Sequence, residues 1–302
     1  MTTQTDLQSK LRGSLVAIIT PMLADGSIDY PGMRELIEWH IASGTDGIVV
    51  SGTTGEAPTL SFNEIEELVS FSVEVVNKRV PVIAGSGTNA TRSSIELSQR
   101  LEKAGADALL VVVPYYNKPT QQGMQAHFLA VTEAVNLPII LYNVPGRTSS
   151  DLLPETVIEL AKHPRIIAIK EAKETDGRIQ EIITKCKNKL ILLSGDDLTC
   201  REFILLGGDG VISVTANILP RQMHLMTHAA LAGDLEKSLE LDEKMAALHT
   251  NIFKEPNPCP TKWALAQMGK IGSETSRLPL LPLSTSGHEL IRDSLKVAGI
   301  LL

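Results

Sequence analysis

One lysine stands where an amine is well placed to act as a nucleophile. Lys170 closes the run Ile166–Ile169, which is four consecutive apolar residues, mostly β-branched. Such a run is typical of a strand buried on both faces in a parallel sheet. At the edge of a packed core, desolvation disfavours the ammonium form of a lysine, and the uncharged amine attacks carbonyl carbons. Lys170 is therefore a candidate for Schiff-base chemistry, although a strand-end lysine taken alone more often extends into solvent.

Schiff-base chemistry also needs a proton carrier and groups that hold an acidic substrate. Tyr142 ends the apolar run before that of Lys170, and a phenol can shuttle protons. Thr53 and Thr54 lie between two glycines, in a turn whose N–H and hydroxyl groups can bind a carboxylate. Arg147 offers a two-pronged donor to a second carboxylate. Each also has an ordinary explanation. Tyr142 could only pack in the core, the two threonines could belong to a plain turn, and Arg147 could form a surface ion pair. Together they predict chemistry on small acidic carbonyl compounds.

The elements that must position these residues recur along the chain. Eight apolar, β-rich runs are found at 14–20, 47–51, 81–85, 108–113, 138–142, 166–170, 190–194 and 210–214. Segments with helical periodicity are found at 61–78, 91–103, 121–135, 154–163, 198–206, 224–232, 235–251 and 284–298. Eight strand–helix units spaced by roughly 20–35 residues predict an α/β fold, the (β/α)8 TIM barrel. Three of its turns share the pattern of a glycine and an aspartate just before a strand.

The strand pattern stops after about residue 222. We therefore expect residues 1–222 to form the barrel that carries the active site, and residues 223–302 to form a C-terminal helical domain. Catalytic groups of such barrels lie at the C-terminal ends of the strands, where Lys170, Tyr142 and the Thr53–Thr54 turn are expected. The polar segment 1–10 has no apolar core of a signal peptide and is expected to be disordered or lightly packed.

Composition excludes several classes of protein. The 302 residues carry a formal charge of −7 and no basic tract, which argues against a nucleic-acid partner. No apolar run approaches the roughly 18 residues of a transmembrane helix, so no membrane partner is expected. Three scattered cysteines, Cys186, Cys200 and Cys259, show no metal-ligand spacing and indicate a reducing, cytoplasmic location.

Three motifs suggest other chemistry and are not favoured. The segment 85–90 fits G-x-G-x-x-A, but Asp107 precedes a strand instead of ending one, as a dinucleotide site requires. His224 and His228 have the spacing of metal ligands on one helix, yet no third ligand is evident and they lie outside the expected active-site face. The pair Asp196–Asp197 is expected to form a hydrogen-bonding loop, because no histidine cluster accompanies it.

Several motifs together carry a resemblance that covers nearly the whole chain. They are Gly52–Glu56, Pro114–Pro119, Tyr142–Thr148, Ile169–Glu171, Ile212–Asn217, Asn257–Pro258 and Arg277–Leu280. In combination they resemble the family of 4-hydroxy-tetrahydrodipicolinate synthases, also called dihydrodipicolinate synthases. That family belongs to the pyruvate-dependent class I aldolases, lyases that act through a Schiff base. The resemblance implies a TIM barrel and a role in lysine and diaminopimelate biosynthesis.

The resemblance also implies roles for individual residues. Lys170 would form the Schiff base with pyruvate. Tyr142 would relay protons, linked to Thr53 and to a Tyr116 that reaches in from a neighbouring subunit. The pyruvate carboxylate would be held by Thr54 and Ile212, and that of L-aspartate 4-semialdehyde by Arg147. The implied assembly is a homotetramer of two tight dimers. No cofactor or metal is expected, because the iminium itself is the electron sink.

One departure from the family pattern concerns regulation. In members inhibited by lysine, histidines and a glutamate help to bind the inhibitor, and here the matching positions hold Phe62, Ile65 and Ser93, while Asn89 and Tyr115 remain. We therefore expect feedback inhibition by lysine to be weak or absent.

Three alternatives stay open on the sequence alone. The chain could be another pyruvate-dependent class I aldolase, acting on a sugar acid or a hydroxy-oxoacid. It could be a non-catalytic protein that binds small oxoacids, although binding alone needs no nucleophile. A nicotinamide-dependent oxidoreductase is the least favoured.

Overall fold

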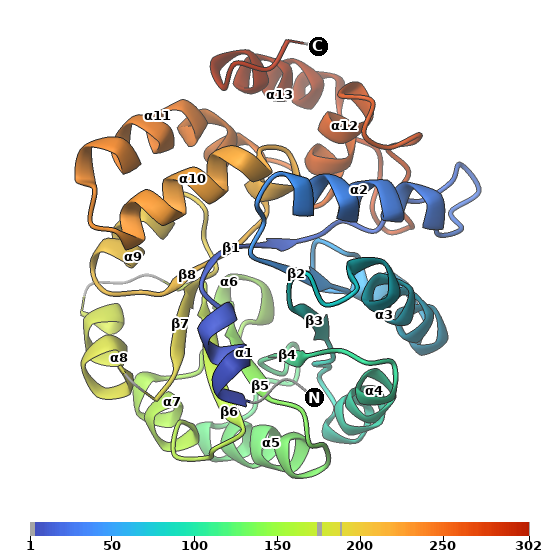
Figure 1. Ribbon diagram of the computed structural model, residues 1–302. Helices are drawn as coiled ribbons and strands as arrows, with labels where there is room; N and C mark the ends of the chain where they lie inside the picture. The colour runs from blue at the N-terminus through green and yellow to red at the C-terminus, as the bar shows by residue number, and fades with distance from the viewer. Residues whose placement is uncertain (1–3, 174–176, 188, 302) are drawn as a thin grey trace.

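A closed barrel of parallel strands forms the centre of the computed structural model, which describes residues 4–173, 177–187 and 189–301 (Figure 1). The strands are β1 (Gly13–Ala17), β2 (Gly47–Val50), β3 (Val82–Gly85), β4 (Ala108–Val112), β5 (Ile139–Asn143), β6 (Ile166–Glu171), β7 (Ile191–Ser194) and β8 (Gly210–Ser213). Each strand pairs with the next, and β8 pairs with β1. All eight predicted strands are present to within a few residues, so the TIM-barrel prediction is confirmed.

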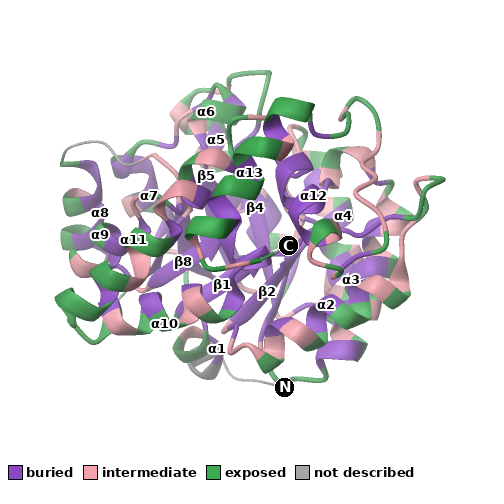
Figure 2. Ribbon diagram, turned by 90° about the horizontal axis from the view of Figure 1, so that it is seen from above, coloured by how far each residue is buried: buried purple, intermediate pink, exposed green. Residues whose placement is uncertain are grey.

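The strands read as unbroken apolar runs because both of their faces are buried. Successive side chains of a strand point to opposite faces. Thus Leu15 and Val49 belong to the cluster that fills the barrel, whereas Val16 and Ile48 pack under the surrounding helices. Figure 2 shows the strands buried along most of their length, with exposed residues in loops and on outer helix faces. This double burial fixes which side chains of each strand point into the barrel.

Helices surround the barrel on its outside (Figure 1). They are α2 (Tyr30–Ala42), α3 (Phe62–Val76), α4 (Thr91–Lys103), α5 (Gln121–Glu133), α7 (Pro154–Leu160), α8 (Arg178–Cys186), α9 (Cys200–Leu205) and α10 (Pro220–Leu231). A capping box begins α3, since Ser61 and Glu64 bond to each other's backbone N–H. Its helix ends earlier than predicted because Asn77 adopts the left-handed conformation.

The repeated glycine–aspartate turns have a common structural role. Asp46, Asp107 and Asp209 each precede a strand, and each carboxylate accepts a hydrogen bond from a backbone N–H at the start of the preceding strand. The three bonds are 2.8 or 2.9 Å long. Each aspartate therefore joins two neighbouring strands at the N-terminal end of the barrel, which explains the motif.

The last helices pack beside the barrel. They are α11 (Leu235–Asn251), α12 (Cys259–Gln267) and α13 (Thr285–Val297). Figure 1 shows α12 and α13 at one edge, next to α2, while α11 packs against α10 and α13. The predicted boundary after residue 222 falls within α10, which packs against β1.

The N-terminal segment was expected to be disordered or lightly packed, and residues 4–10 are not disordered. These residues form α1 (Gln4–Lys10), which lies across the N-terminal end of the barrel in Figure 1. Leu7 and Leu11 are buried, and they join the interior cluster beside Leu15. The segment looks polar because only two leucines are needed to close that end of the barrel. Residues 1–3 lie outside the described ranges.

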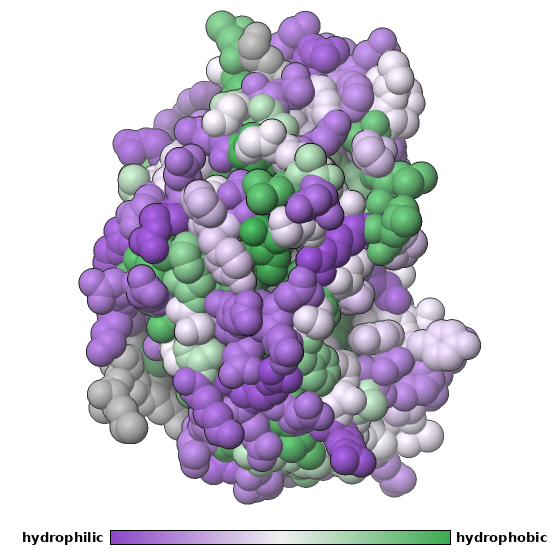
Figure 3. Space-filling view, turned by 90° about the vertical axis from the view of Figure 1, so that its right-hand side faces the viewer, coloured by the Kyte–Doolittle hydropathy of each residue, from purple (hydrophilic) through white to green (hydrophobic). Residues whose placement is uncertain are grey.

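The surface is mixed in character. On the face shown in Figure 3, hydrophobic side chains form separate patches among polar ones. None of the helices in the described part of the chain has the length and apolar character needed to cross a bilayer.

Candidate active site

Lys170 lies at the C-terminal end of β6 and points into the mouth of the barrel. Its side chain is almost fully buried. In the parallel register of β5 and β6, Tyr142 lies directly opposite Lys170, as expected from their places at neighbouring strand ends. The Lys170 Nζ atom lies 4.4 Å from the centroid of the Tyr142 ring. The sheet register therefore places an amine and a phenol together.

A cavity of about 160 Å³ opens around this pair. Its walls include Thr53, Thr54, Tyr142, Arg147 and Lys170, so five of the seven predicted site residues share one pocket. Other walls are formed by Ala17, Val49, Gly52, Leu110, Val144, Ala172, Gly195, Asp196, Val214, Phe253 and Asn257. The pocket lies at the C-terminal ends of the strands, which is the functional face of this fold.

The Thr53–Thr54 turn is held from two sides. The Thr20 hydroxyl donates to the Gly55 carbonyl at 2.8 Å, and the Asn257 side-chain amide donates to the Thr54 hydroxyl oxygen at 2.9 Å. Because the Thr54 oxygen accepts this bond, its own hydrogen is free to be donated to a ligand. Asn257 precedes α12, so the C-terminal helices help to build the site. Residue-based reasoning gave Asn257 no role; its only signal was its place in a family motif.

A buried ion pair lies next to the Thr53–Thr54 turn and supports it. The Glu56 carboxylate pairs with the Lys262 ammonium, and both side chains are fully shielded from solvent. Lys262 also donates to the Thr275 carbonyl at 2.7 Å, and the Arg277 N–H donates to Glu56. Burial lowers the pKa of Lys262, and the adjacent Glu56 opposes that shift. This pair was missed because a lysine within a short helix gives no sign of its burial.

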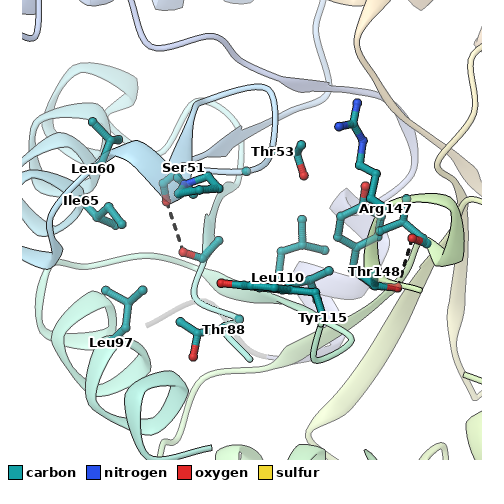
Figure 4. Close-up of a pocket in the computed structure, with 18 of the residues that line it drawn as sticks. Ser51, Thr53, Leu60, Ile65, Thr88, Leu97, Leu110, Tyr115, Arg147 and Thr148 are labelled. Atoms are coloured by element: carbon teal, nitrogen blue, oxygen red, sulfur yellow. Dashed lines mark hydrogen bonds between the residues drawn. The ribbon is translucent and has the colours of Figure 1, made fainter. Parts of the chain in front are cut away.

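Arg147 borders the opening of the pocket. It belongs to the short helix α6 (Pro145–Thr148), which begins with a proline directly after β5. Figure 4 shows its guanidinium extending past Thr53 at the rim. Its side chain is exposed, and no carboxylate in the described ranges forms an ion pair with it. The guanidinium is thus available to an anionic ligand.

A second cavity, of about 390 Å³, adjoins the first and shares Thr53, Tyr142 and Arg147 with it. Figure 4 shows its apolar wall, which includes Leu60, Ile65 and Leu97.

Two predicted site residues lie elsewhere in this single chain. Ile212 is buried within the barrel, in the same apolar cluster as Tyr142. Tyr116 is 87% exposed, is not among the described walls of the pocket and has a φ of 73°. A positive φ is uncommon for a tyrosine and costs about 1–3 kcal/mol. Their roles stay predictions.

Charged side chains also meet on the outer face of β6. Glu171 is buried and accepts bonds from the Arg178 guanidinium at 2.9 and 3.1 Å and from the Asn143 amide at 2.9 Å. Burial raises the pKa of Glu171 to about 7, and Arg178 opposes that shift. Because neighbouring residues of a strand face opposite sides, this cluster fixes the strand end that carries Lys170.

The aspartate pair after β7 forms a hydrogen-bonding loop, as expected. The Asp197 carboxylate accepts from the N–H groups of Val214 and Thr215 at 2.9 and 2.8 Å. Asp196 accepts from the Leu198 N–H at 2.8 Å. Their carboxylates therefore order the loops after β7 and β8.

Comparison with known proteins agrees with this geometry. Residues 10–298 match the Dihydrodipicolinate synthetase family. The chain belongs to this family. It is 50% identical to the 4-hydroxy-tetrahydrodipicolinate synthase of Ralstonia nicotianae over 293 residues, which cover 97% of this chain and 99% of the relative.

Solved structures of the dihydrodipicolinate synthetase family share the fold. The chloride-inhibited dihydrodipicolinate synthase of Acinetobacter baumannii, complexed with pyruvate, superposes with a TM-score of 0.94 at 49% identity, covering 96% of this chain and 100% of that one. A monomeric dihydrodipicolinate synthase variant has a TM-score of 0.94 at 40% identity, covering 98% of this chain and 99% of its own. The resemblance inferred from the motifs is confirmed. The family therefore includes at least one monomeric variant, so membership alone does not fix an oligomeric state.

Proposed function

We propose that this chain is a 4-hydroxy-tetrahydrodipicolinate synthase, a lyase that condenses pyruvate with L-aspartate 4-semialdehyde in lysine and diaminopimelate biosynthesis. The observation that carries the proposal is the buried Lys170 amine, which faces a pocket beside the Tyr142 ring and has no carboxylate partner among the described residues. A buried lysine without a counter-ion is costly, so it is expected where its chemistry is needed.

The reaction begins with an imine. The Lys170 nitrogen attacks the ketone carbon of pyruvate, and the resulting carbinolamine loses water once its hydroxyl receives a proton, which the neighbouring Tyr142 phenol can supply. The iminium withdraws electrons from the methyl group, which then loses a proton to give the enamine. The electron pair of the broken C–H bond becomes the nucleophile, so no other electron sink is required.

The second substrate then enters above the first. The enamine carbon attacks the aldehyde carbon, a carbon–carbon bond forms, and the aldehyde oxygen takes up a proton. The amino group of the former semialdehyde next attacks the imine carbon, closes the ring and releases Lys170. The product carries the new hydroxyl group, and every proton taken up by one step is released by another.

Two carboxylates require two anion sites, and the pocket offers one at the Thr53–Thr54 turn and one at its rim. The free Thr54 hydroxyl hydrogen and the N–H groups of its turn suit the pyruvate carboxylate, with the backbone at Ile212 as the predicted further contact. Arg147 at the rim, which pairs with no described carboxylate, suits the carboxylate of the larger substrate, which a guanidinium binds through two parallel bonds. The charges of the two sites and their positions thus favour pyruvate at the Thr54 turn and the semialdehyde at Arg147.

The proposed assembly is a homotetramer of two tight dimers in the cytoplasm. The dimer is supported by the exposed Tyr116, which the family resemblance assigns to the neighbouring subunit's proton relay. In such a dimer each chain would complete the other's site. Within each chain, residues 1–222 would form the catalytic barrel and residues 223–302 the helical domain.

The test adds pyruvate and L-aspartate 4-semialdehyde to purified protein and follows product through a coupled reductase. Turnover in the wild type and none in Lys170→Ala are expected, with a borohydride-stable pyruvate adduct only in the wild type. If the adduct forms without turnover of the semialdehyde, the protein is another pyruvate aldolase, and sugar-acid or hydroxy-oxoacid substrates are tested next. If no adduct forms, Schiff-base catalysis is excluded.

A further inference from the structure

Two histidines and an aspartate meet at the N-terminal end of the barrel, opposite the active-site pocket. His224 and His228 lie one turn apart on α10, and Asp46 precedes β2. The Asp46 carboxylate lies 3.3 Å from His224 Nδ1 and 3.0–3.1 Å from His228 Nε2. One ligand atom from each residue lies within 4.8 Å of the others. The third ligand that the sequence did not reveal is thus supplied by a distant turn.

The surroundings keep the cluster open and oriented. The Ser14 N–H donates to Asp46 Oδ2 at 2.8 Å and fixes the carboxylate. A Cβ atom at Gly13 would lie 2.2 Å from that oxygen, and one at Gly44 would lie 3.1 Å from the His224 ring. Gly44 also has a φ of +91°, which favours glycine. Both glycines therefore leave space that any other residue would fill.

The other strand-joining aspartates show that this turn does not need histidines. Asp107 and Asp209 make the same bond to the preceding strand as Asp46 does. Asp209 pairs with Arg12, and no histidine in the described ranges bonds to either carboxylate. Among the acids that the structure describes, only Asp46 has two imidazoles converging on it. The structural role of the turn therefore leaves the histidine pair unexplained.

We propose that Asp46, His224 and His228 bind a divalent transition-metal ion of the zinc class. Imidazole nitrogens and a carboxylate oxygen are ordinary zinc ligands, at bond lengths of about 2.0–2.2 Å. Ligands of a tetrahedral ion with such bonds lie roughly 3.3 Å apart, close to the two histidine–aspartate separations. His228 is about half exposed, so water can reach the remaining coordination position.

The bound ion would connect α10 to the start of β2. It would replace two hydrogen bonds with metal–ligand bonds and would hold the helix against the N-terminal end of the barrel. The Ser14 N–H would act as an outer partner that orients the ligating carboxylate, as such groups do at other metal sites. The ion is thus a stabilising element remote from the catalytic pocket.

The test uses full-length protein without an affinity tag, stripped of metal with a chelator. Calorimetric titration with ZnCl2 is expected to show one saturable ion per chain in the micromolar range. His224→Asn and His228→Gln keep an amide near the ring nitrogen but remove the ligand, and they are expected to lose this binding. Asp46→Asn should do the same while still accepting the Ser14 bond.

The matched control is His163→Gln. His163 pairs with one carboxylate, that of Glu133 at 2.7 Å, and should not affect zinc binding. The wild type is also expected to gain thermal stability with ZnCl2, a gain that His228→Gln should lack. Titration with CoCl2 identifies the ligands, because the three free cysteines are the competing donors. A cobalt–thiolate absorption band, an absence of stoichiometric binding, or unchanged binding in both histidine variants would overturn the proposal.

Discussion

Two of the lysines that the structure describes are buried, and their surroundings differ in one respect. Lys262 is completely enclosed between α12 and the Thr53–Thr54 turn, where the Glu56 carboxylate balances its charge. Lys170 is 5% exposed, yet its ammonium lies over the face of the Tyr142 ring, 4.4 Å from the centroid, and pairs with no carboxylate among the described residues. The charge of Lys262 is balanced by an ion pair within the fold, whereas the Lys170 amine faces an open cavity.

The difference separates structural cations from chemical ones. A buried charge is tolerated when it is paired, because removing one partner leaves the other without compensation. A buried amine that faces a cavity and that no described carboxylate engages is available to attack a carbonyl carbon. The same contrast holds for arginines. Arg277 is paired with Glu64, whereas Arg147 faces the pocket without a carboxylate partner among the described residues.

The largest expected effect comes from Lys170→Met. Loss of the only lysine among the described walls of the pocket should lower kcat by ~10⁴-fold or more, since removing a covalent nucleophile has effects of this order. The free energy of unfolding should fall by no more than about 1 kcal/mol, because no ion pair is broken and the volume is nearly conserved. Coupled turnover and urea unfolding measure the two quantities. A severe loss of stability would mean that Lys170 also supports the fold.

Lys262→Met should show the reverse pattern. It leaves Glu56 buried and unpaired, so the free energy of unfolding should fall by about 3–5 kcal/mol. The double variant Lys262→Met/Glu56→Gln removes both charges and should recover much of that loss. Borohydride trapping of pyruvate should persist in any folded fraction. Urea unfolding of the two variants checks the first claim, and equal losses in both would contradict it.

These two lysines also show what the sequence can and cannot reveal. Lys170 was predicted because a strand-end position can be read from an apolar run, and a barrel brings all strand ends to one face. Lys262 was not, because its burial depends on how residues about 200 positions apart pack together, which no local pattern encodes. The eight strands were predicted because they too are apolar runs that can be read locally. The burial of Leu7 and the contact of Asn257 with the Thr54 turn were missed because they depend on how separate parts of the chain pack together.

Arg147→Ala should raise the KM for the semialdehyde by roughly 10–100-fold, which corresponds to the ~1.5–3 kcal/mol of a hydrogen bond to a charged group. Imine formation with pyruvate alone should be unchanged, because that carboxylate is expected at the Thr54 turn. Arg147→Lys should recover only part of the affinity, since an ammonium lacks the two-pronged geometry. Initial rates at varied semialdehyde concentration measure the KM, and borohydride trapping of pyruvate in parallel measures imine formation. An equal effect on both substrates would place their carboxylates in one site.

Arg277 provides the matched comparison. Arg277→Ala removes the partner of Glu64 and the side-chain bonds to the Gly26 and Thr59 carbonyls, so it should lower stability and not selectively change either KM. A change confined to the semialdehyde KM would show that a paired arginine can also determine substrate affinity.

The smallest expected effect concerns added lysine. Phe62 and Ile65 line the larger cavity together with Tyr115, and its described walls contain no carboxylate or imidazole, while Ser93 lies outside that lining. A lysine bound there would leave its ammonium group without a charged partner, and each missing partner weakens binding by about 1–3 kcal/mol. Half-maximal inhibition should therefore require more than about 1 mM lysine, an affinity weaker than −4.1 kcal/mol. Rates measured across a lysine series test this, with Phe62→His as the variant expected to increase sensitivity. Half-maximal inhibition at micromolar lysine would contradict this prediction. It would show that the affinity of the second cavity for lysine does not depend on charge pairing, the property that distinguishes Lys262 from Lys170.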